Sequence, residues 1–284
     1  MSKTRLDQLL VLRGLAENRS RAQALLLAGK VRVAGQVQTK AGFAVAENID
    51  LVVDSPLPYA SRGGFKLAHA LDTFQLDATG LVALDAGAST GGFTDVLLQR
   101  GAKRVYAVDV GYGQLAWALR QDPRVIPVER TNIRYLESLP SPLALPASPN
   151  SSPEGELEQQ EGEKAACASV DLSFISLRLV LPAIQRLLTS DAWVVALVKP
   201  QFEAGVKQVG KGGVVREPAV HRQVLGEVME AATFLGLSPW GLTRSPITGP
   251  AGNQEFLLWL QNGRLQPTSP LGAELLIVKA LQGK

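Results

Sequence analysis

The chain of 284 residues contains very little cysteine and histidine: one Cys, at position 167, and two His, at positions 69 and 221. A single cysteine excludes a disulfide framework and a zinc site built on several thiolates. Two histidines are too few for a histidine-rich metal site. We therefore expect no metal centre in this protein.

Long apolar runs are also missing. The longest, Ala192–Val198, is far shorter than the ~20 residues that a membrane-spanning helix needs. The first residues, MSKTRLDQ, lack the apolar core of a signal peptide. The composition, 46% hydrophobic and 19% charged, is ordinary for a soluble globular protein. We expect a cytoplasmic protein that does not contact a membrane.

Charge is unevenly distributed along the chain. The formal net charge is +3, yet residues 1–66 contain ten Lys or Arg and five Asp or Glu, a net charge of +5. The remaining residues contain nineteen and twenty-one, a net charge of −2. A basic front end on a nearly neutral body favours binding of a polyanion by the front end.

The front end is predicted to be a small α+β domain. Leucines at helical spacing end at Gly14, and Ser20 is placed to cap a second helix that ends at Gly29. Alternating valines between positions 31 and 37 predict a β-hairpin. A basic cluster is often only a solvated face, but confinement of the charge to one compact element favours RNA binding. The expected RNA-binding residues of this region are Arg5, Arg19, Arg21, Lys30 and Arg32.

This region resembles the S4-type RNA-binding module over roughly residues 3–53. The matching segments are Arg5-Leu6-Asp7, Ser20-Arg21-Ala22 and Gly29-Lys30-Val31. The resemblance implies RNA docking and no chemistry. We expect an S4-type domain at residues 1–56, a linker at 57–62 and a second domain at 63–284.

From residue 81 onward, buried strands and helices alternate, which predicts a mostly parallel α/β sheet whose last strand is antiparallel. Residues 140–168 interrupt this pattern. They are rich in Pro, Ser and Glu, so we expect a disordered insertion. The predicted strands lie at 81–85, 104–109, 125–128, 169–171, 193–198, 237–244 and 255–261, and the predicted helices at 94–100, about 113–121 and 218–235.

A glycine-rich turn follows the first of these strands, in the segment LDAGASTGGFTD. Glycines at positions 87, 91 and 92 let the backbone pass close to a ligand. Asp109, at the end of the next strand, is placed to accept hydrogen bonds from ribose hydroxyls. The spacing GxxxGG differs from the GxGxxG of dinucleotide-binding dehydrogenases, and the acid before the first glycine, Asp85, disfavours a pyrophosphate. The positive charges of S-adenosylmethionine suit this acid, so we expect S-adenosylmethionine as cofactor; a tight turn without a ligand is the alternative.

The methyl acceptor is inferred by elimination. Methyltransferases that act on exocyclic amines usually carry Asp/Asn-Pro-Pro-aromatic after the fourth strand, where this chain has Asp171-Leu-Ser-Phe. Enzymes that methylate carbon 5 of cytosine need a cysteine nucleophile, and Cys167 falls in the expected insertion. Because no metal cluster is expected either, a hydroxyl oxygen is the favoured acceptor.

Four charged side chains are expected at the sheet edge where ligands bind in open α/β folds. Asp171 ends the fourth strand, Lys199 ends the fifth, and Glu255 begins the last. Lys66, in SRGGFKL, joins them if this segment packs across the edge. Such charges would stabilise the alkoxide that forms as a hydroxyl is methylated. A free lysine has a pKa of ~10.4, so Lys199 is expected to act as a cation unless Lys66 lowers its pKa substantially; a set of ordinary rim ion pairs is the alternative.

Eight segments together closely resemble the TlyA family of S4-fused 2′-O-methyltransferases of ribosomal RNA, also known as haemolysin A: SRGGFKL, LDAGASTGGFTD, YAVDVGYGQL, TNIR, VDLSFISL, LVKPQFE, VGKGGVVRE and GNQEFLLWL. The resemblance implies a Rossmann-like class I methyltransferase domain of the FtsJ/RrmJ type, with a Lys-Asp-Lys-Glu tetrad at Lys66, Asp171, Lys199 and Glu255. It implies a cytidine ribose of ribosomal RNA, free or in ribosomal subunits, as acceptor. No obligate protein partner is evident from the sequence. The implied cofactor-binding residues are Asp85, Gly87, Ser89, Thr90, Gly91, Gly92, Phe93, Asp109, Asn132 and Asp171.

A glycine-rich basic loop, GVKQVGKGGVVRE, follows the fifth predicted strand. Its Lys211 and Arg216 either contact the target RNA or simply face solvent. Three other functions remain as alternatives. A pseudouridine synthase shares the front module but has a mostly β catalytic fold, and a pore-forming haemolysin needs a membrane-active segment that the sequence lacks. An RNA-binding assembly factor with an inactive methyltransferase fold would not bind the cofactor.

Overall fold

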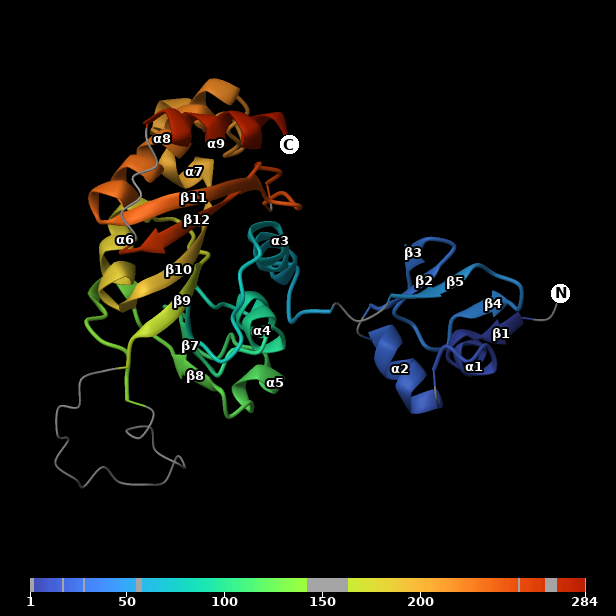
Figure 1. Cartoon of the computed structure of the whole chain (residues 1–284). Helices are drawn as coiled ribbons and strands as arrows, with labels where there is room; N and C mark the ends of the chain where they lie inside the picture. Colours follow the sequence, from blue (N-terminus) through green and yellow to red (C-terminus); the bar gives the residue numbers. More distant parts are fainter. Residues whose placement is uncertain are drawn as a thin grey trace. The chain divides into compact units, whose positions relative to one another are not determined.

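The computed structural model describes residues 3–16, 18–27, 29–54, 58–141, 163–249, 251–263 and 270–283. The chain forms two compact units, Met1–Pro58 and Tyr59–Lys284 (Figure 1). The division lies inside the segment expected to be a linker, 57–62. Most of that segment nevertheless packs on the second unit, where the Ala60 amide donates to the Asp95 carboxylate at 2.7 Å. The second unit therefore begins at Tyr59, before the expected residue 63.

The amino-terminal unit contains two helices and two small antiparallel sheets. Its elements are β1 (Lys3–Arg5), α1 (Leu6–Leu12), α2 (Arg19–Leu27), β2 (Val31–Val33), β3 (Gln36–Val37), β4 (Ala44–Ala46) and β5 (Leu51–Val53). The sheets have the strand orders β1-β4 and β3-β2-β5. Leu6 and Leu10, which share one face of α1 because they are four residues apart, and Leu26 of α2 are completely buried between the elements. The predicted hairpin is present, but α2 begins at Arg19, so Ser20 lies inside its first turn and is not its cap.

A seven-stranded sheet forms the centre of the second unit. Its strands are β6 (Val82–Ala86), β7 (Arg104–Val108), β8 (Val125–Val128), β9 (Ala165–Val170), β10 (Leu188–Val198), β11 (Leu237–Arg244) and β12 (Phe256–Asn262). The spatial order is β11-β12-β10-β9-β6-β7-β8. The five neighbouring strands β10-β9-β6-β7-β8 are parallel to one another. Strand β12 is antiparallel to both of its neighbours, β10 and β11. This arrangement confirms the Rossmann-like fold class and is not the mostly β fold of a pseudouridine synthase.

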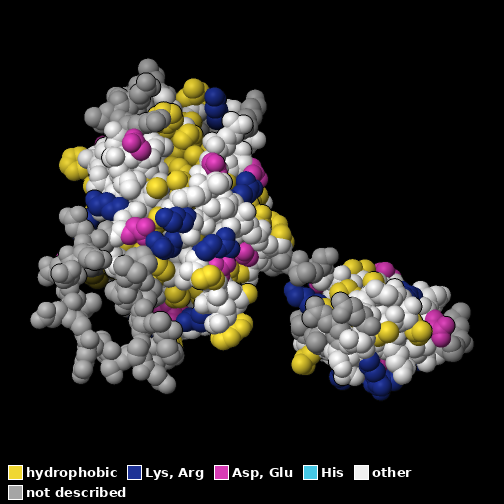
Figure 2. All heavy atoms as spheres, turned by 60° about the horizontal axis from the view of Figure 1, so that its bottom comes forward, with side chains coloured by type: hydrophobic (Ala, Val, Ile, Leu, Met, Phe, Trp, Pro, Cys, Tyr) yellow, Lys and Arg dark blue, Asp and Glu magenta, His cyan; other side chains and the backbone are white. Residues whose placement is uncertain are grey.

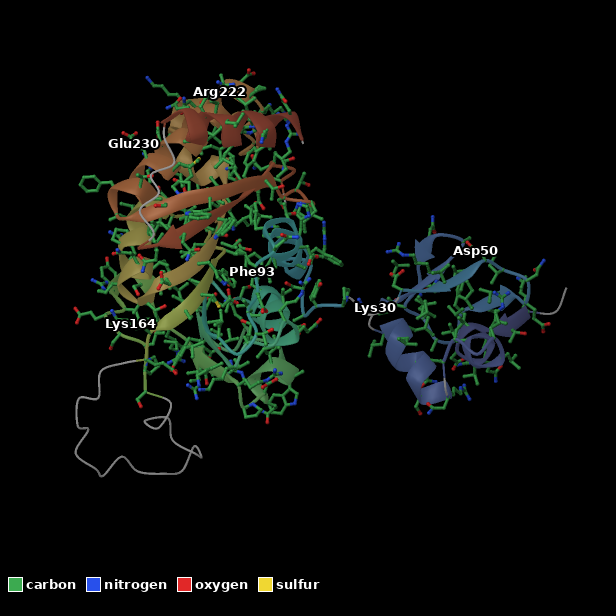
Figure 3. All side chains as sticks on the ribbon, in the orientation of Figure 1. Lys30, Asp50, Phe93, Lys164, Arg222 and Glu230 are labelled. Carbon is green, nitrogen blue, oxygen red and sulfur yellow. The ribbon has the colours of Figure 1, made fainter. Side chains whose placement is uncertain are left out.

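Helices cover both faces of this sheet, with one hydrophobic core on each side (Figure 1). They are α3 (Gly64–Phe74), α4 (Gly92–Gln99), α5 (Trp117–Arg120), α6 (Leu177–Arg186), α7 (Pro200–Glu203), α8 (Pro218–Phe234) and α9 (Pro270–Gln282). Leu71 of α3 and Phe93 of α4 contribute to one core, and Ile184 of α6 and Val228 of α8 contribute to the other (Phe93 is labelled in Figure 3). None of the helices in the described part of the chain is long and apolar enough to cross a membrane.

The segment expected to be a disordered insertion, 140–168, lies mostly outside the described residues. Its carboxyl end was assigned wrongly, because Ala165–Val170 forms strand β9 in the middle of the sheet. Cys167 is completely buried there, and burial raises the pKa of its thiol to about 12. Cys167 is therefore unsuited to act as a nucleophile, because it is buried in the sheet and not because it lies in a disordered loop.

Candidate active site and RNA interface

A cavity of about 460 Å³ lies at the carboxyl ends of strands β6, β7 and β9. This volume is typical of a small-molecule site. Five of the residues predicted to bind the cofactor line it: Gly87, Ser89, Asp109, Asn132 and Asp171. Half of the ten predicted cofactor residues therefore meet at this cavity, because parallel strands bring their carboxyl ends to one edge.

Two residues fix the shape of the cavity. Gly87 has a φ of +90°, and a Cβ atom there would lie 2.3 Å from the carbonyl oxygen of Asp171, so only glycine fits. The Asp109 carboxylate accepts hydrogen bonds from the amides of Ser89 at 2.8 Å and Gly111 at 2.7 Å. Each of its oxygens can accept a further hydrogen bond. Asp109 thus holds two loops and keeps the capacity to bind hydroxyl groups.

The other five predicted cofactor residues, Asp85, Thr90, Gly91, Gly92 and Phe93, do not line this cavity. Asp85 is completely buried, and its carboxylate accepts hydrogen bonds from the hydroxyls of Thr94 at 2.6 Å and Ser169 at 2.9 Å. Burial raises the pKa of Asp85 to about 6, although both hydroxyls oppose the shift. Asp85 therefore joins the start of α4 to β9 and supports the turn from within the fold.

The glycines of SRGGFKL and of the turn bring α3 against the start of α4. A Cβ atom at Gly64 would lie 2.5 Å from the Tyr59 side chain. A Cβ atom at Gly92 would lie 2.2 Å from Ser61 Oγ and 3.0 Å from the Gly64 nitrogen. A side chain at Gly92 would force the two backbones apart, and one at Gly64 would displace the Tyr59 side chain. This close packing places the first turn of α3, which contains Lys66, beside the sheet.

The four residues of the predicted tetrad form two ion pairs. Lys66 Nζ lies 2.6 Å from Glu255 Oε2, and Lys199 Nζ lies 2.6 Å from Asp171 Oδ1. Both lysine side chains are only 10% exposed. Val198 pairs with Phe256 in the antiparallel ladder, so Lys199 and Glu255 leave adjacent strands at the same edge. The sequence prediction that these charges meet at the ligand-binding edge agrees with this geometry.

Each ion pair borders a cavity. Asp171 lines the first cavity, as does Ser173, whose hydroxyl accepts a hydrogen bond from Lys199 Nζ at 3.0 Å. Lys66 borders a second cavity of about 420 Å³, which Arg62 and Thr248 also line. The arrangement thus offers space for one molecule beside each pair of charges.

Two exposed aromatic residues near the first cavity were not predicted. Phe174 lines the cavity, has a φ of +63° and is 88% exposed. Tyr112 is 67% exposed, and the Arg130 guanidinium lies 4.2 Å from its ring centre. Such rings can stack on nucleic acid bases. Their positions shortly after Asp171 and Asp109 were the available clue, since both acids end strands at the ligand-binding edge.

The predicted RNA-binding residues of the amino-terminal unit remain accessible although several form ion pairs. Arg5 and Arg19 both pair with Asp7, and Arg32 pairs with Asp54. These arginine side chains are 44–55% exposed. Lys30 is partly exposed (Figure 3), and the side chain of Arg21 lies outside the described part of the chain.

The predicted basic loop of the second unit is held in place by Asn253. The Asn253 side chain accepts a hydrogen bond from the Val215 amide at 2.9 Å and donates one to the Gly213 carbonyl at 2.8 Å. Lys211 and Arg216 of this loop are exposed. Asn253 therefore anchors the loop beside the segment that leads to Glu255.

Figure 2 shows Lys and Arg side chains grouped among hydrophobic ones on one face of the second unit.

Known proteins resemble this chain over nearly its whole length. Residues 59–262 match the FtsJ-like methyltransferase family, and residues 4–48 match the S4 domain. The 16S/23S rRNA (cytidine-2′-O)-methyltransferase TlyA of Mycobacterium tuberculosis is 44% identical over 281 residues, which cover 98% of this chain and 97% of that protein. A candidate rRNA methyltransferase of Bacillus subtilis, YqxC, is 48% identical over 259 residues, 91% of this chain and 85% of that protein. The solved structure of a candidate hemolysin of Streptococcus thermophilus has a TM-score of 0.69 at 41% identity and covers 100% of this chain and 97% of that one. This chain therefore belongs to the TlyA family of FtsJ-like methyltransferases that carry an S4 domain.

Proposed function

We propose that this protein transfers a methyl group from S-adenosylmethionine to a ribose 2′-hydroxyl of ribosomal RNA, in the cytoplasm. The observation that carries the proposal is the presence of two ion pairs with nearly buried lysines, Lys66–Glu255 and Lys199–Asp171, at the ligand-binding edge of a methyltransferase fold. The name of the Mycobacterium tuberculosis relative supports a cytidine as the target nucleoside. No obligate protein partner is part of the proposal.

The residues that line the first cavity fit S-adenosylmethionine. Asp109 has acceptor capacity for the two ribose hydroxyls, and the Asp171 carboxylate favours the positive charges of the cofactor. Asn132 accepts a hydrogen bond from the Arg134 amide through Oδ1 at 3.1 Å, which leaves its NH₂ group to donate to a ring nitrogen. When bound, the cofactor supplies an electrophilic methyl group on a sulfonium.

The two lysines act as cations in this proposal. A 2′-hydroxyl is a weak nucleophile: as its oxygen bonds to the methyl carbon, the carbon–sulfur bond would break and the hydroxyl proton would pass to solvent water, so negative charge develops on the oxygen. Lys199 stabilises this charge, and its ion pair with Asp171 requires the ammonium form. Water is largely excluded around both lysines, which strengthens the electrostatic interaction. The second cavity, beside Lys66, offers space for the acceptor nucleotide.

RNA would be bound mainly by the amino-terminal unit. Its half-exposed arginines suit contacts with phosphates, which are sequence-independent and sensitive to salt. Lys211, Arg216 and the exposed rings of Tyr112 and Phe174 would hold the target strand near the reacting groups. Deletion of residues 1–54 should weaken RNA binding and its salt dependence and leave the affinity for the cofactor unchanged. If the affinity for RNA is unchanged by the deletion, the second unit is the main RNA-binding part of the protein.

The chemistry can be tested with ribosomal subunits and a radioactive methyl donor. Alkali cleaves RNA through the free 2′-hydroxyl, so a 2′-O-methyl group blocks cleavage at its own phosphodiester. We expect the label in alkali-resistant dinucleotides that contain cytidine. Label released in mononucleotides would indicate methylation of a base and contradict the proposal.

Two further measurements address the other functions. An assembly factor with an inactive fold would bind RNA but show no heat of S-adenosylmethionine binding in calorimetry. A haemolysin would lyse erythrocytes when purified and free of detergent. We expect cofactor binding in the first measurement and no lysis in the second.

A further inference from the structure

We infer that Asp7 is a positioning residue that holds Arg5 and Arg19 together as one phosphate-binding site for RNA. The inference rests on the proposed function, because it specifies how the amino-terminal unit would bind its RNA. It gives a function to a buried carboxylate in a unit that is expected to bind RNA, which is negatively charged.

Asp7 accepts hydrogen bonds from several side chains at once. Arg5 donates through Nε and Nη2 to the two carboxylate oxygens, both at 3.1 Å, and Arg19 Nε donates to Oδ2 at 2.9 Å. Gln23 Nε2 donates to the same oxygen at 3.1 Å. The Asp7 side chain is completely buried. The hydrogen bonds from Arg5, more than any other contact, hold the pKa of Asp7 well below its usual range and so favour the charged carboxylate.

The two arginines come from different elements. Arg5 is the residue before α1, and Arg19 is the first residue of α2. The Arg5 guanidinium also lies against the backbone at Gly42, where a Cβ atom would be 3.2 Å from Nη1. The buried Asp7 carboxylate thus fixes the orientation of the guanidiniums of Arg5 and Arg19.

Within the part of the chain that the structure describes, most donors of the two guanidiniums have no hydrogen-bond partner. Each guanidinium has five N–H groups; Arg5 uses two of them on Asp7 and Arg19 uses one. The side chains are 45% and 55% exposed. A phosphate accepts two parallel hydrogen bonds from a guanidinium, and a pre-oriented guanidinium loses less entropy on binding. An RNA phosphate is therefore the ligand that this pair of arginines fits.

The test is a substitution in the full-length protein that adds positive charge and is nevertheless expected to weaken RNA binding. Asp7→Asn makes the unit more positive by one charge, so an effect of net charge alone would tighten RNA binding. We expect Asp7→Asn to weaken binding to purified ribosomal subunits about tenfold and to lower the slope of log affinity against log salt by about one. Asp50→Asn is the matched control, since Asp50 is an exposed carboxylate of the same unit (Figure 3). Its binding should be equal to wild type or tighter.

Circular dichroism checks that each variant is folded. If Asp7→Asn is not folded, Arg19→Lys replaces it: this variant keeps the charge, removes the planar guanidinium and should weaken binding about threefold or more.

Two results would contradict the inference in different ways. Unchanged affinity of a folded Asp7→Asn or of Arg19→Lys, with strong loss in the double variant Arg5→Ala/Arg19→Ala, would overturn the positioning role alone. Unchanged affinity of that double variant would instead contradict the proposed RNA-binding function of the unit.

Discussion

The two units hold their cations in opposite ways. In the amino-terminal unit one buried carboxylate, Asp7, serves two arginines that remain half-exposed. In the second unit each lysine has its own carboxylate, and both lysines are nearly buried. Exposed cations attract a polyanion through water and are weakened by salt, whereas buried cations act strongly on a single group placed beside them. The difference separates a surface suited to docking from a site suited to chemistry.

The largest expected effect is on Lys199. Lys199→Ala should lower the turnover number by about a hundredfold or more, because the developing negative charge loses its cation. Cofactor affinity in calorimetry should stay near that of the wild type. Lys164→Ala is a suitable control, since Lys164 is exposed just before β9, at the end of that strand remote from Asp171 (Figure 3). Parallel losses of binding and turnover in Lys199→Ala would contradict the role as a cation for the reacting oxygen.

The next effect contrasts a buried and an exposed ion pair. Glu255→Ala leaves Lys66 buried without its partner and should lower the free energy of unfolding by about 3 kcal/mol. Asp54→Ala breaks the exposed pair with Arg32 and should lower it by less than about 1 kcal/mol. Urea unfolding measures both. Similar losses in the two variants would mean that the pair beside α3 is not buried from solvent as described.

The third effect depends on pH. The pKa of Asp85 is raised to about 6 in the folded protein, above its ordinary value of 3.8, so the folded state binds this proton more tightly than the unfolded state. The contribution of Asp85 to stability therefore falls as pH rises from about 4 to about 6 and is constant above. Asp85→Asn cannot titrate, so the stability of this variant relative to wild type should rise over that interval by about 2–3 kcal/mol. Urea unfolding at several pH values that gives a constant difference would refute the raised pKa.

The smallest expected effect concerns a single exposed cation. Arg32→Ala should weaken binding of ribosomal subunits a few-fold and reduce the salt slope by about one. Cofactor affinity should not change, because Arg32 belongs to the amino-terminal unit. The same salt slope as wild type would remove Arg32 from the RNA-binding surface.

The sequence predicted the sheet and its charged edge because these depend on local patterns. Asp109, Asp171 and Lys199 each follow a run of buried residues, and parallel strands end at the same edge. The tasks of the glycines were harder to predict. Gly92 is required by the close approach of the Gly64 backbone, which is distant in sequence, and Gly64 by the Tyr59 side chain that packs on it, so both depend on tertiary packing.

Other features escaped prediction for similar reasons. Helix α6 contains Pro182, which hides its helical pattern, and its Ser176 cap is recognisable mainly from the hydrogen bond it makes. The network around Asp7 joins it to residues up to sixteen positions away. Asp85 was expected to face the ligand, but the hydroxyls of Thr94, nine residues on in the following helix, and of Ser169, 84 residues on in β9, enclose it.

The most direct test of the account is a crystal structure with RNA and a donor analogue that cannot transfer its methyl group. We predict that the analogue occupies the cavity lined by Gly87, Asp109 and Asp171. The target 2′-oxygen should lie within hydrogen-bond distance of Lys199 Nζ and in line with the position of the methyl group. A target oxygen remote from both lysines, or an analogue bound elsewhere, would contradict the central claim that these ion pairs make the ribose oxygen reactive.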